Sequence, residues 1–79
     1  MSHVWTLSWF DRETERLAGE ERLKTLSDGA VSAIVGMPAD EILGGEWPID
    51  LERAQRLERA TGFKPALGQY DYFLGATAV

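Results

Sequence analysis

The feature that most limits the fold of this chain is a strict alternation of side chains near its N-terminus. Between residues 3 and 11, one set of alternate positions holds Trp5, Leu7 and Trp9, and the other holds Thr6, Ser8 and Phe10. A period of two residues is the spacing of a β-strand with one face buried. We therefore predict a strand over His3–Asp11 whose tryptophan-bearing face lies in the core. Such a strand needs partner strands beside it and a layer that covers the buried face.

The length of the chain limits how large that core can be. With 79 residues and no cysteine, residues 1–79 form one domain that has a single small core and no disulfide to support it. The absence of cysteine is typical of a reducing compartment, and the chain begins without the basic start and apolar run of a signal peptide. Its apolar stretches are far shorter than the ~20 residues of a membrane-spanning helix. We expect a cytoplasmic protein with no membrane contact.

Turn-forming residues place the other strands. A polar connection over 11–14 leads to a second strand over about 15–24, in which Gly19 is a candidate bulge. The segment 38–48 is predicted to be a loop with a candidate short strand near Trp47. A last strand is expected over about 70–76, because apolar and polar residues alternate there as well.

Two helices are expected from their end signals. Ser27 or Asp28 is the predicted N-cap of a short helix that ends at Gly36. Asp50 is the predicted N-cap of a second helix that ends at Gly62. The order strand, strand, helix, helix, strand predicts an α+β fold. Its small antiparallel sheet has three or four strands, with one or two short helices packed on one face.

The sequence offers little for catalysis. His3 is the single histidine and lies beside a chain end, so a triad of serine, histidine and aspartate would depend on a poorly anchored base. Glu20 and Glu21 are adjacent in a predicted strand and should point to opposite faces. Glycine-rich phosphate loops and the residue spacings of metal sites are absent. We predict no enzymatic activity, no catalytic residues, no metal and no cofactor.

The charge of the chain suggests its partner. Thirteen acidic residues against eight Lys and Arg give a net charge of −5, which disfavours direct binding to nucleic acid. Residues 1–50 hold ten acids and four bases, a net charge of −6. Concentrated acidic charge fits a basic protein partner approached by electrostatic steering, and the alternative is simple solvation of the surface. We expect a monomer or a weak dimer.

Two phenylalanines fall on strand faces that should be polar. Phe10 alternates with Thr6 and Ser8, and Phe73 shares its face with Asp71. If the first and last strands are neighbours, these aromatics meet and form an apolar patch together with Leu17. The predicted acidic rim of this patch is Asp11, Glu13, Glu15, Glu20 and Glu21. Aromatic anchors within a charged rim are typical of a protein-binding surface, and the alternative is that the second helix covers this face.

Two further features leave alternatives open. Trp47 stands in a loop without periodicity, so it is either an exposed anchor or a plug beneath the loop. The second helix carries Arg53, Arg56 and Arg59 at three-residue spacing, interleaved with Glu52 and Glu58. This stripe is either a solvated face with local ion pairs, which is the more common case, or a grip for an anion.

Three segments of the chain resemble one known family. They are "LSWFDRETERLAGEE" at Leu7–Glu21, "DGAVSAIVGMP" at Asp28–Pro38 and "DYF" at Asp71–Phe73. In their order and spacing they are similar to the cloacin-type immunity proteins, which protect bacteria from colicins and cloacin that cleave ribosomal RNA. The resemblance implies a small antiparallel sheet without enzymatic activity. It also implies a tight complex with the basic nuclease domain of a bacteriocin or contact-delivered toxin.

The resemblance also implies roles for particular residues. The positions that match Phe10, Leu17, Glu20 and Phe73 contribute to the toxin interface in that family, and the position that matches Trp47 varies with the toxin. If the toxin is secreted, the protein would leave the cell in complex with it. The alternative from another class is a regulatory or interaction domain that shares the fold and meets a partner other than a toxin.

Overall fold

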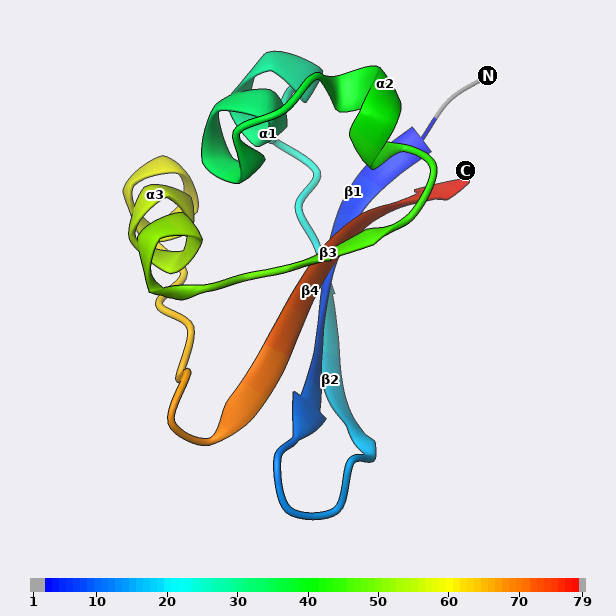
Figure 1. The fold of residues 1–79 in the computed structure, drawn as a ribbon. Helices are drawn as coiled ribbons and strands as arrows, with labels where there is room; N and C mark the ends of the chain where they lie inside the picture. Colours follow the sequence, from blue (N-terminus) through cyan, green and yellow to red (C-terminus); the bar gives the residue numbers. More distant parts are fainter. Residues whose placement is uncertain (1–2, 79) are drawn as a thin grey trace.

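The chain forms an α+β structure in a computed structural model that describes residues 3–78 (Figure 1). The elements within that range are β1 (His3–Asp11), β2 (Leu17–Arg22), α1 (Asp28–Val35), α2 (Ala39–Ile42), β3 (Glu46–Pro48), α3 (Leu51–Thr61) and β4 (Tyr70–Ala78). The strands make one antiparallel sheet in the order β2-β1-β4-β3. The predicted fold class is confirmed, and the candidate short strand near Trp47 is β3.

The β1–β2 hairpin differs from the prediction at its turn. We expected the second strand to begin near Glu15, but β2 spans only Leu17–Arg22. Oδ1 of Asp11 accepts hydrogen bonds from the backbone N–H groups of Glu13 (2.8 Å) and Thr14 (3.0 Å), which extends the turn. Glu15 then takes a left-handed backbone conformation with φ of 61°. The turn therefore includes Glu15 and Arg16, which we had assigned to the second strand.

The ends of the two longer helices follow the predicted signals. The side chain of Ser27 accepts a hydrogen bond from the backbone N–H of Ala30, so Ser27 is the N-cap of α1. Asp50 accepts in the same way from the N–H of Arg53 at the start of α3. Gly36 and Gly62 end these helices in the left-handed conformation, with φ of 89° and 78°.

The segment predicted to be a loop contains one extra helical turn. α2 spans Ala39–Ile42 and follows Pro38, whose fixed φ suits the start of a helix. Ile42 is fully buried in the core, which explains why the backbone coils at this point. Within residues 3–78, none of the helices is long and apolar enough to cross a membrane.

The core lies between the helices and one face of the sheet. Trp5 and Leu7 of β1 are buried there with Leu74 of β4, as the alternation predicted. The helices supply the opposing layer, which consists of Val31, Ile34, Val35, Ile42, Ala54 and Leu57. Burying these side chains contributes about 1.5 to 3 kcal/mol for each large one, which is a large share of the stability of so small a domain.

An acidic side chain at the start of α1 ties the N-terminal strand to the helix layer. Oδ1 of Asp28 accepts hydrogen bonds from Nε1 of Trp5 and Nε2 of His3, both at 2.9 Å. The His3 and Trp5 rings meet edge to face at 5.2 Å. The hydrogen bonds from His3 and then from Trp5 hold the pKa of Asp28 below its ordinary value.

This lowered pKa predicts a loss of stability in acid. Because the folded state lowers the pKa of Asp28, its contribution is present above the unfolded value of about 4 and is lost as the pH falls through the folded-state pKa. We expect Asp28→Asn to weaken this part of the acid dependence. Melting temperatures of both proteins between about pH 6 and pH 2 check it. Parallel curves for the two proteins would contradict the role of Asp28.

Candidate protein-binding surface

The predicted aromatic patch is present on the face of the sheet that lies opposite the helices. The rings of Phe10 and Phe73 meet edge to face, with centroids 5.9 Å apart. Leu17 is the cross-strand partner of Phe10 on β2, and its side chain is 56% exposed. We call Phe10, Leu17 and Phe73 the aromatic patch. The prediction that these residues come together is confirmed.

The described helices leave this face uncovered. Ala54 and Leu57 of α3 pack into the core with Trp5 and Leu7, so α3 lies on the other side of the sheet (Figure 1). The alternative that the second helix covers the phenylalanines is therefore wrong. Phe10 and Phe73 are half-buried by each other and by their strand neighbours, and an aromatic pair of this kind is preorganised for contact.

The predicted acidic rim is only partly on the same face. Glu20 pairs with Ser8 across the strands and lies on the side of the aromatic patch, whereas Glu21 pairs with Leu7 and lies on the helix side. Asp11 is engaged in the turn by its two backbone hydrogen bonds. Glu13 and Glu15 are exposed in the hairpin turn at the end of the patch.

Two other acidic residues belong to this face and were missing from the predicted rim. Asp71 pairs with Phe10 across β1 and β4, and Glu46 pairs with Gly75 across β3 and β4. The alternation of β4 already placed Asp71 beside Phe73, but assigning Glu46 required the position of β3. Asp71 also lies 3.5 Å from Nε of Arg12, an exposed ion pair that partly neutralises this rim.

The excess of negative charge is concentrated away from the hairpin. Residues 11–24 carry five acidic and four basic side chains, whereas residues 28–50 carry five acidic side chains and no basic one. Figure 1 shows α1 and α2, which belong to the second segment, at the end of the sheet remote from the β1–β2 turn. The hairpin end of the sheet, where the aromatic patch lies, thus carries mixed charge, whereas much of the purely acidic segment belongs to the helix layer on the other face.

Trp47 does not join the aromatic patch. It pairs with Leu74 across β3 and β4, which places its side chain on the helix side of the sheet. The indole is half-buried against the core, and its Nε1 donates a hydrogen bond to the backbone oxygen of Ile42 at 3.3 Å. This placement favours the plug over the exposed anchor, because the loop turns the ring inward to cover the core.

We therefore expect Trp47→Ala to lower the folding stability of the domain. The affinity of the aromatic patch for a partner should not change. Removing a half-buried indole that fills the space beside α2 should cost about 1 to 2 kcal/mol of folding free energy. Chemical denaturation measures this loss, and a binding titration of the folded variant measures the partner affinity. Unchanged stability together with weakened binding would restore the anchor hypothesis.

Two of the three arginines of α3 are bound to the end of α1. Arg53 donates from Nε to the backbone oxygen of Val35 (3.1 Å) and from Nη1 to that of Pro48 (2.8 Å). Arg56 donates to the backbone oxygen of Ile34 (3.3 Å) and pairs with Glu52 at 2.8 Å. The bonds to Ile34 and Val35 satisfy the last carbonyl groups of α1, where a cation is favoured. Sequence spacing alone did not reveal this capping from a neighbouring helix.

The fold and the patch define the chain as a small α+β domain with one sheet face available for contact. Residues 4–75 match the model of a protein family described as Domain of unknown function (DUF7683), and the chain belongs to this family. No curated protein matches the chain. The resemblance to cloacin-type immunity proteins stays a prediction, because neither comparison tests it.

Proposed function

We propose that this domain is an immunity protein that binds and neutralises the basic nuclease domain of a bacteriocin or contact-delivered toxin. The observation that carries the proposal is the aromatic patch, an edge-to-face pair with an exposed leucine on a sheet face opposite the helices. Patches with aromatic anchors and a polar rim are typical of protein interfaces. The resemblance of Leu7–Glu21 to the immunity family supplies the class of partner.

In this proposal the domain acts by occupying the surface with which the toxin meets nucleic acid. The ring edges of Phe10 and Phe73, together with Leu17, supply contact area from which water is expelled. Glu20, Asp71 and Glu46 lie on the same face and meet basic side chains that would otherwise hold phosphates. The mechanism is steric and electrostatic and involves no chemical step.

A nuclease inhibition assay tests the proposal. The partner to use is a basic C-terminal nuclease domain encoded in the neighbouring reading frame. We expect a stable stoichiometric complex and loss of ribosomal RNA cleavage at equimolar domain. A stable complex with a neighbouring protein that has no nuclease activity would instead favour the alternative, a regulatory domain. Absence of any complex with the nuclease would overturn the proposal.

Association with such a partner should depend on salt. The net charge of −5 attracts a basic domain over distances that salt screens, so the association rate should fall by about tenfold as ionic strength rises from about 50 mM to 500 mM. The dissociation rate should change much less. Stopped-flow measurements separate the two rates. A flat association rate would contradict acidic steering even if the complex is tight.

A further inference from the structure

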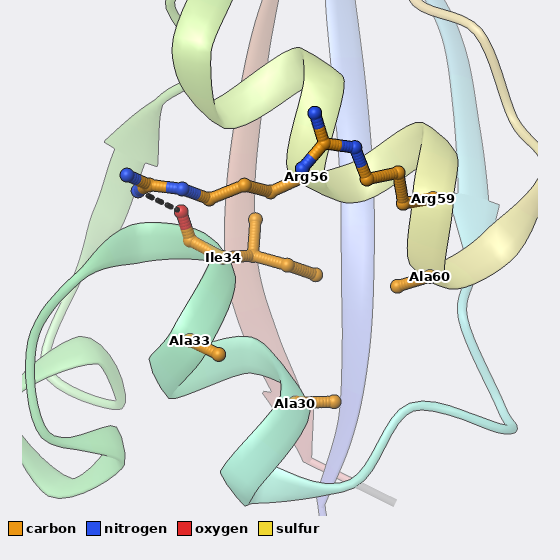
Figure 2. A pocket seen from close by; sticks show the side chains of 6 residues that line it. All are labelled: Ala30, Ala33, Ile34, Arg56, Arg59 and Ala60. Carbon is orange, nitrogen blue, oxygen red and sulfur yellow. Dashed lines mark hydrogen bonds between the residues drawn. The ribbon is translucent and has the colours of Figure 1, made fainter.

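A second concave surface lies between α1 and α3, away from the aromatic patch. Figure 2 shows the side chains that line it, which are Ala30, Ala33 and Ile34 from α1 and Arg56, Arg59 and Ala60 from α3. Its volume is about 380 Å³, near the lower end of the range of about 300 to 1,000 Å³ for small-molecule sites. We call this surface the α1–α3 groove.

The floor of the groove is apolar because its side chains are short. Ala30 and Ala33 lie about one helical turn apart on α1, and Ala60 faces them from α3 (Figure 2). Ile34 is buried beneath them, whereas Ala33 and Ala60 are exposed to solvent. Longer side chains at these positions would fill the space between the helices. The alanines therefore leave apolar surface open to a ligand.

The wall of the groove on α3 is positively charged. Arg56 is fixed by the backbone oxygen of Ile34 and by Glu52, so its stem is a rigid part of that wall. The side chain of Arg59 makes no hydrogen bond or ion pair within the part of the chain that the structure describes. Its guanidinium group is thus available to an anion, beside apolar surface, in a chain with a net charge of −5.

We propose that the α1–α3 groove binds a small aliphatic carboxylate. The hydrocarbon tail lies on the floor formed by Ala30, Ala33 and Ile34, and the carboxylate accepts hydrogen bonds from the guanidinium group of Arg59. An inorganic anion would leave the apolar floor unused, and an aliphatic cation would be repelled by Arg59, since the charge of Arg56 is compensated by Glu52. This site is independent of the aromatic patch and does not rest on toxin binding.

Decanoate is a suitable probe for this site. We expect saturable shifts of the methyl resonances of Ala33, Ile34 and Ala60 in ¹H–¹³C spectra of the full chain, with a Kd of about 1 mM or lower. Decyltrimethylammonium has the same tail with the opposite charge, and inorganic phosphate has charge without a tail. Both should bind at least about tenfold more weakly, because each lacks one of the two interactions.

Two variants locate the probe in the groove. Ala33→Leu fills the floor and should abolish the saturable shifts, whereas Arg59→Gln should weaken decanoate binding by about two- to fivefold. Ala78→Leu and Arg22→Gln make the same types of change at exposed positions on the sheet and should leave binding unchanged. The proposed site would be contradicted if the shifts with decanoate do not saturate or if decyltrimethylammonium binds equally well. It would also be contradicted if neither groove variant changes decanoate binding.

Discussion

Phe10→Ala and Phe73→Ala are each expected to weaken partner binding strongly while the domain stays folded. Each removes one ring of a half-buried edge-to-face pair, which should cost about 1 kcal/mol of folding free energy. For a domain of this size that lowers the melting temperature by about 4 to 8 °C. Binding should weaken by about 2 to 4 kcal/mol for each variant, because central aromatic anchors dominate interface energies.

Trp9→Ala is the control variant for this experiment, because it removes an aromatic ring from the buried face of the same strand. Trp9 precedes Phe10 on β1 but lies on the helix side, where its ring packs against Phe63 (5.5 Å) and Tyr72 (5.4 Å). Its removal should cost about 3 to 5 kcal/mol and abolish the cooperative melt. Leu51→Ala, at an exposed leucine on α3, should change neither property. If the phenylalanine variants melt as poorly as Trp9→Ala, the patch is part of the folding core and the binding surface is lost.

Gly19→Ala is expected to destabilise the domain although it adds only a methyl group. The indole of Trp9 lies directly over Gly19, its cross-strand partner, and a Cβ at that position would overlap the ring. The ring cannot move freely, because Phe63 and Tyr72 hold its other side. Overpacking of this kind costs about 1 to 3 kcal/mol, and we expect the upper end of that range.

Denaturation and tryptophan fluorescence measure this effect together. We expect a lower unfolding midpoint and a shift in the tryptophan emission of the chain as the indole of Trp9 is displaced. Gly45→Ala is the matched control, because a Cβ at Gly45 has no heavy atom within 4 Å. If Gly19→Ala melts like Gly45→Ala, the close packing of Trp9 on β2 does not contribute to stability.

Local patterns determined much of the secondary structure. The alternation in β1 identified the strand and its buried face, because period two follows directly from the pleat of the backbone. Asp50, Gly36 and Gly62 marked helix ends, because a side-chain cap and a left-handed residue act within a few positions of themselves. The same alternation placed Phe10 and Phe73 together on one face once β1 and β4 were neighbours, but only the position of α3 showed that this face is uncovered.

Other features depended on contacts between distant segments. α2 forms where Ile42 finds a place in the core, and Trp47 turns inward because β3 pairs with β4 in a register that opposes Trp47 to Leu74. The capping of α1 by Arg53 and Arg56 joins residues about twenty positions apart in the chain. The position of the bulge also depended on the pairing: Gly19 was the expected site, but the register pairs Gly19 with Trp9 and leaves Ala18 without a partner on β1.

The sequence by itself therefore determined β1, β4 and the two longer helices, since their end signals and periodicity act within a few residues. Only the tertiary structure decided which residues lie together on each exposed surface. The acidic rim that looked continuous along the hairpin is split between two faces of the sheet, and the α1–α3 groove exists only where two helices bring their alanines together. A surface depends on which segments become neighbours, and that choice is made by packing of the whole chain.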